Sequence, residues 1–147
     1  MRQVWVDADA CPRNVMHFLR CNEAQLGYDL WTVSSSNHML SGEQHITVDP
    51  EPQAVDIVIA NRMQPGDIVV TQDWGLAAVI LGKGGLAIAP SGLIYTSERM
   101  PFMLEQRNVL ARHRRGGGRT RGPAARTEAD DLRFQQAFIK LLGSSYA

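Results

Sequence analysis

Short apolar runs alternate with segments of helical periodicity along most of this 147-residue chain. The apolar runs lie at residues 4–6, 29–35, 46–48, 68–71 and 86–89. Apolar side chains at helical spacing fill residues 12–26, the segment that follows 49–52, and residues 74–81. Because strands that alternate with helices pair in parallel, we expect an α/β fold: a three-layer α/β/α sandwich with a central, mainly parallel sheet.

Size and composition favour one soluble domain. A chain of 147 residues with 44% hydrophobic content can form one core but is short for two, so we expect a single domain over residues 1–147. It has neither a leader segment nor about 18 uncharged apolar residues in a row, which predicts a cytoplasmic protein without a membrane partner. Cys11 and Cys21 lack the spacing of a zinc site or a redox pair, so we expect two buried free thiols.

A basic segment follows a predicted helix at residues 97–112. Between Arg107 and Arg126 there are seven arginines, several glycines and no acid, which predicts an exposed, flexible loop at about residues 113–126. Arginines in such a loop can track the phosphates of a nucleic acid, although a merely solubilising loop has the same composition. The candidate nucleic-acid-binding residues are Arg112, Arg114, Arg115, Arg119 and Arg121.

The last predicted helix covers about residues 127–142. Thr127 has the character of an N-cap, and Asp130, three residues later, supplies the acid of a capping box. Phe134 and Phe138 lie on one face of this helix and predict that it docks on the body of the domain.

The formal net charge of zero hides an uneven distribution. Residues 1–75 contain ten acids and four arginines, a balance of −6, so the remainder of the chain has a balance of +6. This division suits a metal-dependent enzyme with an acidic site and a polyanionic substrate, although charges also scatter unevenly by chance.

Acidic residues come directly after two of the predicted strands. The first apolar run ends in Asp7 and Asp9, and the run at residues 68–71 ends in Asp73. The carboxyl ends of parallel strands meet at one edge of a sheet, where ligands bind in open α/β folds. Asp56 lies on the helix that leads into one of these strands. If Asp7 and Asp9 are both extended, their carboxylates point to the same side and require a cation between them.

Carboxylates without His or Cys select hard cations, so the expected cofactor is Mg²⁺ or Mn²⁺. We predict Asp7, Asp56 and Asp73 as metal ligands, with Asp9 as a further ligand or as the base that positions water. A single Asp after a strand is more often a helix cap, and Asp9 can equally cap the helix that Pro12 begins.

Several motifs resemble the YaiI/YqxD family, also called UPF0178 or DUF188. They are V-D-A-D-A-C-P at residues 6–12, A-V-D-I-V-I-A at 54–60, G-D-I-V-V-T-Q-D at 66–73, and a G-P…T-x-x-D-x-x-x-F tail. The resemblance runs nearly from end to end. It implies a PIN-like fold, because this family is grouped with PIN-like domains, which bind Mg²⁺ or Mn²⁺ through clustered acids and mostly cut RNA. Asp7 resembles the first PIN aspartate, and Thr71 with Asp73 resembles the T/S-x-D element.

The tail departs from the family pattern at one position. Asp131 follows Asp130 where the family usually has an arginine. Either acid can add a carboxylate to the site, and Asp130 is the further candidate residue. The alternative is that these acids only cap the helix and face solvent.

Three functions fit these residues. The first is a Mg²⁺- or Mn²⁺-dependent ribonuclease in which Asp7, Asp9, Asp56 and Asp73 act at the metal and Thr71 orients a carboxylate or water. The second is a phosphatase of the haloacid-dehalogenase type, which would use Asp7-x-Asp9 as nucleophile and acid, although Lys83 is poorly placed for it. The third is a non-enzymatic RNA-binding module whose affinity resides in the basic loop.

Overall fold

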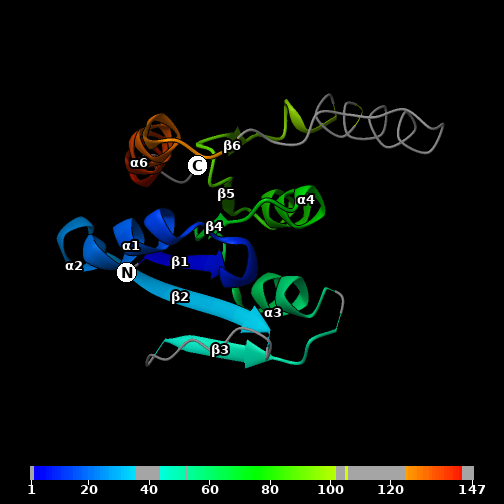
Figure 1. The fold of residues 1–147 in the computed structure, drawn as a ribbon. Helices are drawn as coiled ribbons and strands as arrows, with labels where there is room; N and C mark the ends of the chain where they lie inside the picture. Colours follow the sequence, from blue (N-terminus) through cyan, green and yellow to red (C-terminus); the bar gives the residue numbers. More distant parts are fainter. Residues whose placement is uncertain (1, 36–43, 52, 102–104, 106–124, 144–147) are drawn as a thin grey trace.

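The computed structural model describes residues 2–35, 44–51, 53–101, 105 and 125–143. A six-stranded sheet with the order β3-β2-β1-β4-β5-β6 forms its centre (Figure 1). The strands are β1 (Arg2–Asp7), β2 (Tyr28–Ser35), β3 (His45–Val48), β4 (Ile68–Val70), β5 (Leu86–Ile88) and β6 (Ile94–Tyr95). All neighbouring strands are parallel except β5 and β6, which pair antiparallel.

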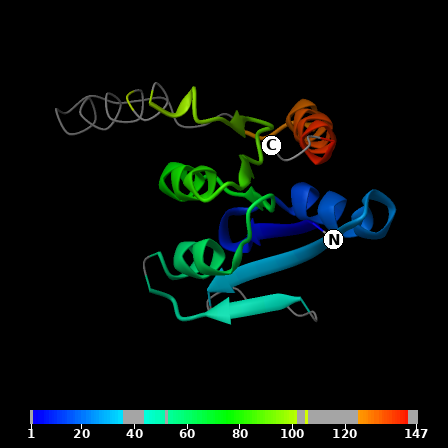
Figure 2. The ribbon, with the colours of Figure 1, turned by 180° about the vertical axis from the view of Figure 1, so that it is seen from behind.

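Helices cover both faces of this sheet (Figures 1 and 2). The helices are α1 (Arg13–Cys21), α2 (Glu23–Leu26), α3 (Ala54–Arg62), α4 (Trp74–Gly82) and α6 (Glu128–Leu142). Buried side chains of α1 and α6 pack on one face and those of α3 and α4 on the other. The predicted three-layer α/β/α architecture is therefore confirmed.

Strand β1 lies in the middle and contributes to both cores. Val4 and Val6 face the helices α1 and α6, whereas Trp5 faces α3 and α4, where it stacks on Trp31 with ring centroids 5.5 Å apart. A strand that is covered on both faces must be apolar throughout, which explains the continuous run that ends at Asp7.

The chain departs from the prediction just after β1. Residues Ala8–Ala10 form a short 3₁₀ helix, η1, so Asp9 is not extended and does not continue the two-residue period of Asp7. The condition under which the Asp7 and Asp9 carboxylates would point to the same side is therefore not met. A tight 3₁₀ turn brings the chain from the strand towards Pro12, where α1 begins.

Three smaller features also differ from the prediction. The expected helix over residues 12–26 divides at Asn22 into α1 and α2, and Gly27 then ends α2 in the left-handed conformation. The short strand β6 was not predicted. Both cysteines are free, but Cys11 is half-buried and Cys21 is exposed, so the expectation of two buried thiols was wrong.

Helix α6 docks as predicted. The Thr127 hydroxyl accepts from the Asp130 amide at 3.3 Å, and the Asp130 carboxylate accepts from the Thr127 amide at 2.9 Å, which completes the capping box. Phe134 and Phe138 are fully buried and stack on each other. At the far end of the helix, the Arg2 guanidinium donates to the last helical carbonyls, at 3.1 Å for Leu142.

The basic segment can be compared only in part. Of the helix expected over residues 97–112, Met100 is helical and buried. Residues 102–104 and 106–124 lie outside the described part of the chain, and so does most of the loop expected at 113–126. No helix within the described ranges is long and apolar enough to cross a membrane.

One buried acid is structural and lies away from the predicted site. Asp67 accepts hydrogen bonds from the Trp5 indole at 3.2 Å, the Gln3 amide at 3.3 Å and the Gln64 amide at 2.8 Å, at the end of the sheet opposite Asp7. We expect Asp67→Ala to lower the free energy of unfolding by about 2–4 kcal/mol, because it leaves these donors without an acceptor. Urea denaturation measures this loss, and a change below about 0.5 kcal/mol would contradict it.

Candidate functional site

The site lies where two neighbouring central strands end. β1 and β4 pair in parallel with Val6 opposite Val70, although β2, β3 and α3 separate them in the sequence. The strand order reverses at β1, whose following strand in the chain, β2, lies on one side and β4 on the other. In open α/β sheets, ligands bind at such a switch point, outside the carboxyl ends of the strands.

A cleft of about 420 Å³ opens at this edge. Four predicted acids line it: Asp7, Asp9, Asp56 and Asp73. They come from the end of β1, from η1, from the first turn of α3 and from the start of α4, respectively. We refer to it as the acid cleft. The topology thus brings together acids that lie up to 66 positions apart in the sequence, as the strand pattern predicted.

Asp9 is fixed by the neighbouring strand. Both of its carboxylate oxygens accept from the Ser35 amide, each at 3.1 Å, at the point where β2 ends. The 3₁₀ turn η1 thereby closes over the edge of the sheet and holds Asp9 at one end of the acid cleft. Sequence reasoning missed this role of Ser35, because donation by a main-chain amide does not depend on the type of residue.

Asp73 is oriented by its own helix. Its Oδ1 atom accepts from the Leu76 amide at 3.0 Å, which makes it the N-cap of α4. Its own amide donates to the Thr71 hydroxyl at 3.0 Å. Thr71 is buried and does not line the acid cleft, so it acts on the site through the main chain of Asp73.

Asp56 faces the other acids from the start of α3. Gln53 precedes this helix with a φ of 67°, a left-handed conformation that is strained for a residue with a side chain. Gln53 and Glu51 also line the acid cleft, and sequence reasoning missed both. The helix-start pattern at residues 49–52 predicted that a helix begins here. It did not indicate that these residues line a cleft.

The acids repel one another. Burial, followed by the charge of Asp9 and more weakly that of Asp73, raises the pKa of Asp7 to about 6. Burial, then a hydrogen bond with Asp73, then the charges of Asp73 and Asp7 raise the pKa of Asp56 to about 7. Among the described residues that line the acid cleft there is no Lys, Arg or His. The cleft therefore concentrates negative potential that a cation would relieve.

The donor chemistry suits a hard divalent cation, since every acid in the cleft offers oxygen. Within the described ranges, however, no three His, Cys, Asp or Glu side chains converge closely enough to hold one ion. A hydrogen bond between the carboxyl groups of Asp56 and Asp73 requires a proton on one of them. That proton offsets part of the repulsion, and a cation that enters the cleft must displace it.

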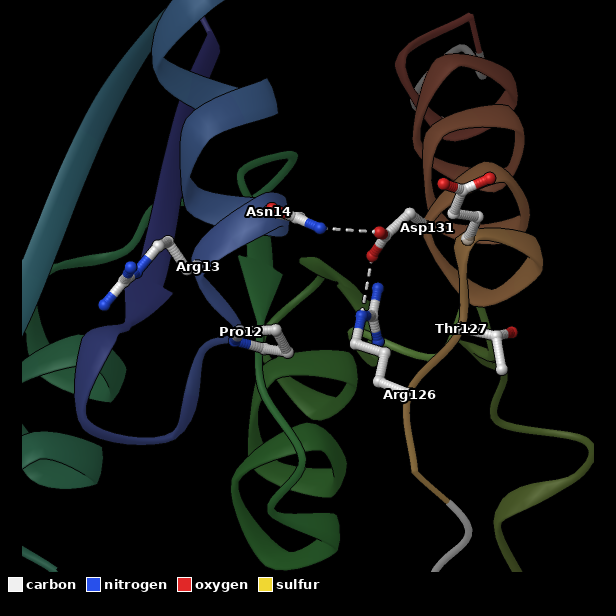
Figure 3. Close-up of a pocket in the computed structure, with 7 residues that line it drawn as sticks. Pro12, Arg13, Asn14, Arg126, Thr127 and Asp131 are labelled. Carbon is white, nitrogen blue, oxygen red and sulfur yellow. Dashed lines mark hydrogen bonds and ion pairs between the residues drawn. The ribbon is translucent and has the colours of Figure 1, made fainter.

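The further candidate Asp130 lies outside the acid cleft. Its carboxylate serves the capping box and pairs with Arg133. Its neighbour Asp131 ties α6 to α1: it accepts from the Asn14 amide nitrogen at 2.9 Å and from Arg126 Nε at 2.7 Å (Figure 3). These two hydrogen bonds hold the pKa of Asp131 below its usual range. The arginines predicted to bind nucleic acid all fall outside the described residues.

Known proteins resemble this chain over nearly its whole length. Residues 5–144 match the family described as "Uncharacterized BCR, YaiI/YqxD family". A UPF0178 protein of Heliobacterium modesticaldum is 45% identical over 93% of this chain and 94% of its own length. A UPF0178 protein of Exiguobacterium sibiricum is 44% identical over 95% of this chain and 96% of its own length. No solved structure matches the chain. Motifs, family match and relatives agree: this chain belongs to the YaiI/YqxD family.

Proposed function

We propose that this protein is a metal-dependent nuclease that hydrolyses RNA phosphodiesters in the acid cleft. The observation that supports the proposal is that Asp7, Asp9, Asp56 and Asp73 line one cleft at the switch point of the sheet, with two pKa values raised by burial and mutual repulsion. Such a cluster destabilises the protein at neutral pH, and a bound cation would offset that cost.

Asp7, Asp56 and Asp73 would hold Mg²⁺ or Mn²⁺ once their side chains move closer together, because no three acids of the described residues converge on one ion in this structure. A cation there would activate water and neutralise the charge that develops on a phosphodiester. Asp9, which the Ser35 amide holds at 3.1 Å, keeps a fixed orientation at the end of the cleft and can position water. Thr71 is a positioning residue, because its hydroxyl holds the Asp73 amide and does not face the cleft.

The direct test is cleavage of a short, fluorescently labelled single-stranded RNA at pH 8. We expect cleavage with Mn²⁺ or Mg²⁺ and none with EDTA. Asp7→Asn is expected to lower the rate by about 100-fold, the effect of losing roughly 3 kcal/mol of transition-state stabilisation. Asp29→Asn is the matched control, because Asp29 lies near the N-terminal end of β2, at the end of the strand away from the acid cleft.

Two other outcomes would contradict the proposal. RNA binding without cleavage, with a steep salt dependence that survives Asp7→Asn, would identify a binding module. Hydrolysis of p-nitrophenyl phosphate that Asp7→Asn abolishes would identify a phosphatase. The phosphatase is the weaker alternative, because Lys83 follows the C-terminus of α4, at the end of the helix away from Asp73.

A further inference from the structure

A second and larger cavity adjoins the acid cleft. Its volume is about 570 Å³, within the range of pockets that bind small molecules. Gln72 and Trp74, the two neighbours of Asp73 in the chain, line this cavity, whereas Asp73 lines the acid cleft. The residues that line the two spaces are thus adjacent in the chain at the start of α4. We call the second space the aromatic pocket.

The walls of the aromatic pocket combine apolar side chains with the polar residues Gln72, Ser91, Arg126 and Asp130. Trp74 is half-buried and meets the ring of Tyr95 edge-on, with centroids 5.7 Å apart and planes at 78°. The Tyr95 hydroxyl donates to the Thr71 carbonyl at 3.3 Å, which fixes the Tyr95 ring beside the end of β4. Pro90 and Leu93 complete the wall. Rigid aromatic and proline surfaces of this kind suit a planar ring, and nucleobases stack on them with little preference among sequences.

The positively charged side chain of Arg126 also lines this pocket. Arg126 lines both the aromatic pocket and a smaller cavity of about 280 Å³ between α1 and α6 (Figure 3). Asp131 accepts from Arg126 Nε at 2.7 Å and is itself held by Asn14, so the guanidinium has a fixed position. Arg126 Nη2 is buried and has no hydrogen-bond acceptor among the described residues.

Arg126 therefore has a hydrogen-bond donor that its ion pair with Asp131 does not use. A buried guanidinium N–H without an acceptor is costly, and phosphate oxygens match the geometry of the group. The acid in the aromatic pocket does not satisfy it, because Asp130 is engaged with Thr127 and Arg133.

We propose that the aromatic pocket binds one nucleotide of the RNA strand, with its base against the half-buried Trp74, which the buried Tyr95 supports from behind, and its phosphate on Arg126. The identity of this nucleotide as part of the substrate rests on the proposed nuclease function. Its location follows from the cavity itself. A strand held there would lie near the acid cleft, because Gln72 and Trp74, which line the pocket, flank Asp73 in the chain.

Calorimetric titration with 5′-AMP, in EDTA, tests the pocket apart from the metal. We expect saturable binding of 5′-AMP, with adenosine and inorganic phosphate each at least about 10-fold weaker, because each lacks one of the two contacts. Arg126→Gln should weaken 5′-AMP about 10-fold, to the level of adenosine. Arg62→Gln is the matched control, because Arg62 is an exposed arginine at the end of α3 and lines neither cavity.

A second variant covers the case in which Arg126→Gln fails to fold for want of the Asp131 ion pair. Ser91 is an exposed turn residue that lines the aromatic pocket, so Ser91→Trp fills the pocket without disturbing the core. We expect it to abolish 5′-AMP binding and to leave the melting temperature unchanged. The absence of saturable binding to the wild-type protein would overturn the proposal, and so would binding that both variants retain.

The same titration separates this inference from the nuclease proposal. Asp73→Asn should retain 5′-AMP binding in EDTA even where it abolishes cleavage. Binding of 5′-AMP by a protein that cleaves no RNA would refute the nuclease and keep the pocket. Cleavage with an unchanged KM in Arg126→Gln and Ser91→Trp would refute the pocket and keep the nuclease.

Discussion

Replacement of Asp73 by Asn is expected to lower metal-dependent RNA cleavage by about 100-fold or more and, in the same protein, to raise the melting temperature of the metal-free form at pH 8. The first effect follows from the loss of a charged oxygen ligand. The second follows from the loss of a negative charge that raises the pKa values of Asp7 and Asp56. Asn is as good an N-cap as Asp, so its amide oxygen can still accept from Leu76 and α4 keeps its first turn.

Asp73→Asn should therefore lower the cleavage rate and raise the melting temperature together. Cleavage rates and thermal melts of the purified variant measure the two effects, and Asp29→Asn serves as control for both. A lower melting temperature for Asp73→Asn would mean that the carboxylate of Asp73 stabilises the fold. The acid cleft would then be a structural network and not a functional site.

The stability of the metal-free protein is expected to fall as the pH rises from 5 to 8. The pKa values of Asp7 and Asp56 rise on folding from 3.8 to about 6 and about 7. Between about pH 4 and 7, the folded chain therefore binds more protons than the unfolded chain, and its free energy of unfolding decreases with pH. Both groups are partly exposed, which attenuates the effect, so we expect a melting temperature about 3–5 °C lower at pH 8 than at pH 5.

Asp56→Asn provides the comparison for this pH dependence, because it removes the more strongly shifted of the two groups. Its melting temperature should vary less with pH than that of the wild-type protein. Mn²⁺ should raise the melting temperature of the wild-type protein at pH 8 and have little effect at pH 5, where protons compete with the ion. Stabilisation by Mn²⁺ that is equal at both pH values would place the ion outside the acid cleft.

The position of the acids was predictable because it depends on strand ends. Continuous apolar runs at residues 4–6 and 68–71 indicated buried parallel strands, and such strands place Asp7 and Asp73 at one edge. The capping box of Thr127 and Asp130 was equally predictable, because side-chain identity alone decides it.

The contacts between elements were not predictable in this way. The turn η1 exists because Asp9 accepts from a main-chain amide of β2, and no pattern in the sequence of η1 encodes a partner 26 residues away. Arg126 was grouped with the basic loop by composition, although the ion pair with Asp131 separates it from that loop and fixes it between two cavities. Composition describes a whole segment, whereas the role of Arg126 depends on the contacts of that single side chain.

The place of α6 determines when the domain can complete its folding during synthesis. The face of β1 formed by Val4 and Val6 belongs to the core that Phe134 and Phe138 of α6 complete. Because α6 follows β1 in the chain, this face of β1 is covered by α1 alone until α6 has been synthesised. The core on this face is therefore complete only when α6 is present, and shortening α6 exposes part of β1.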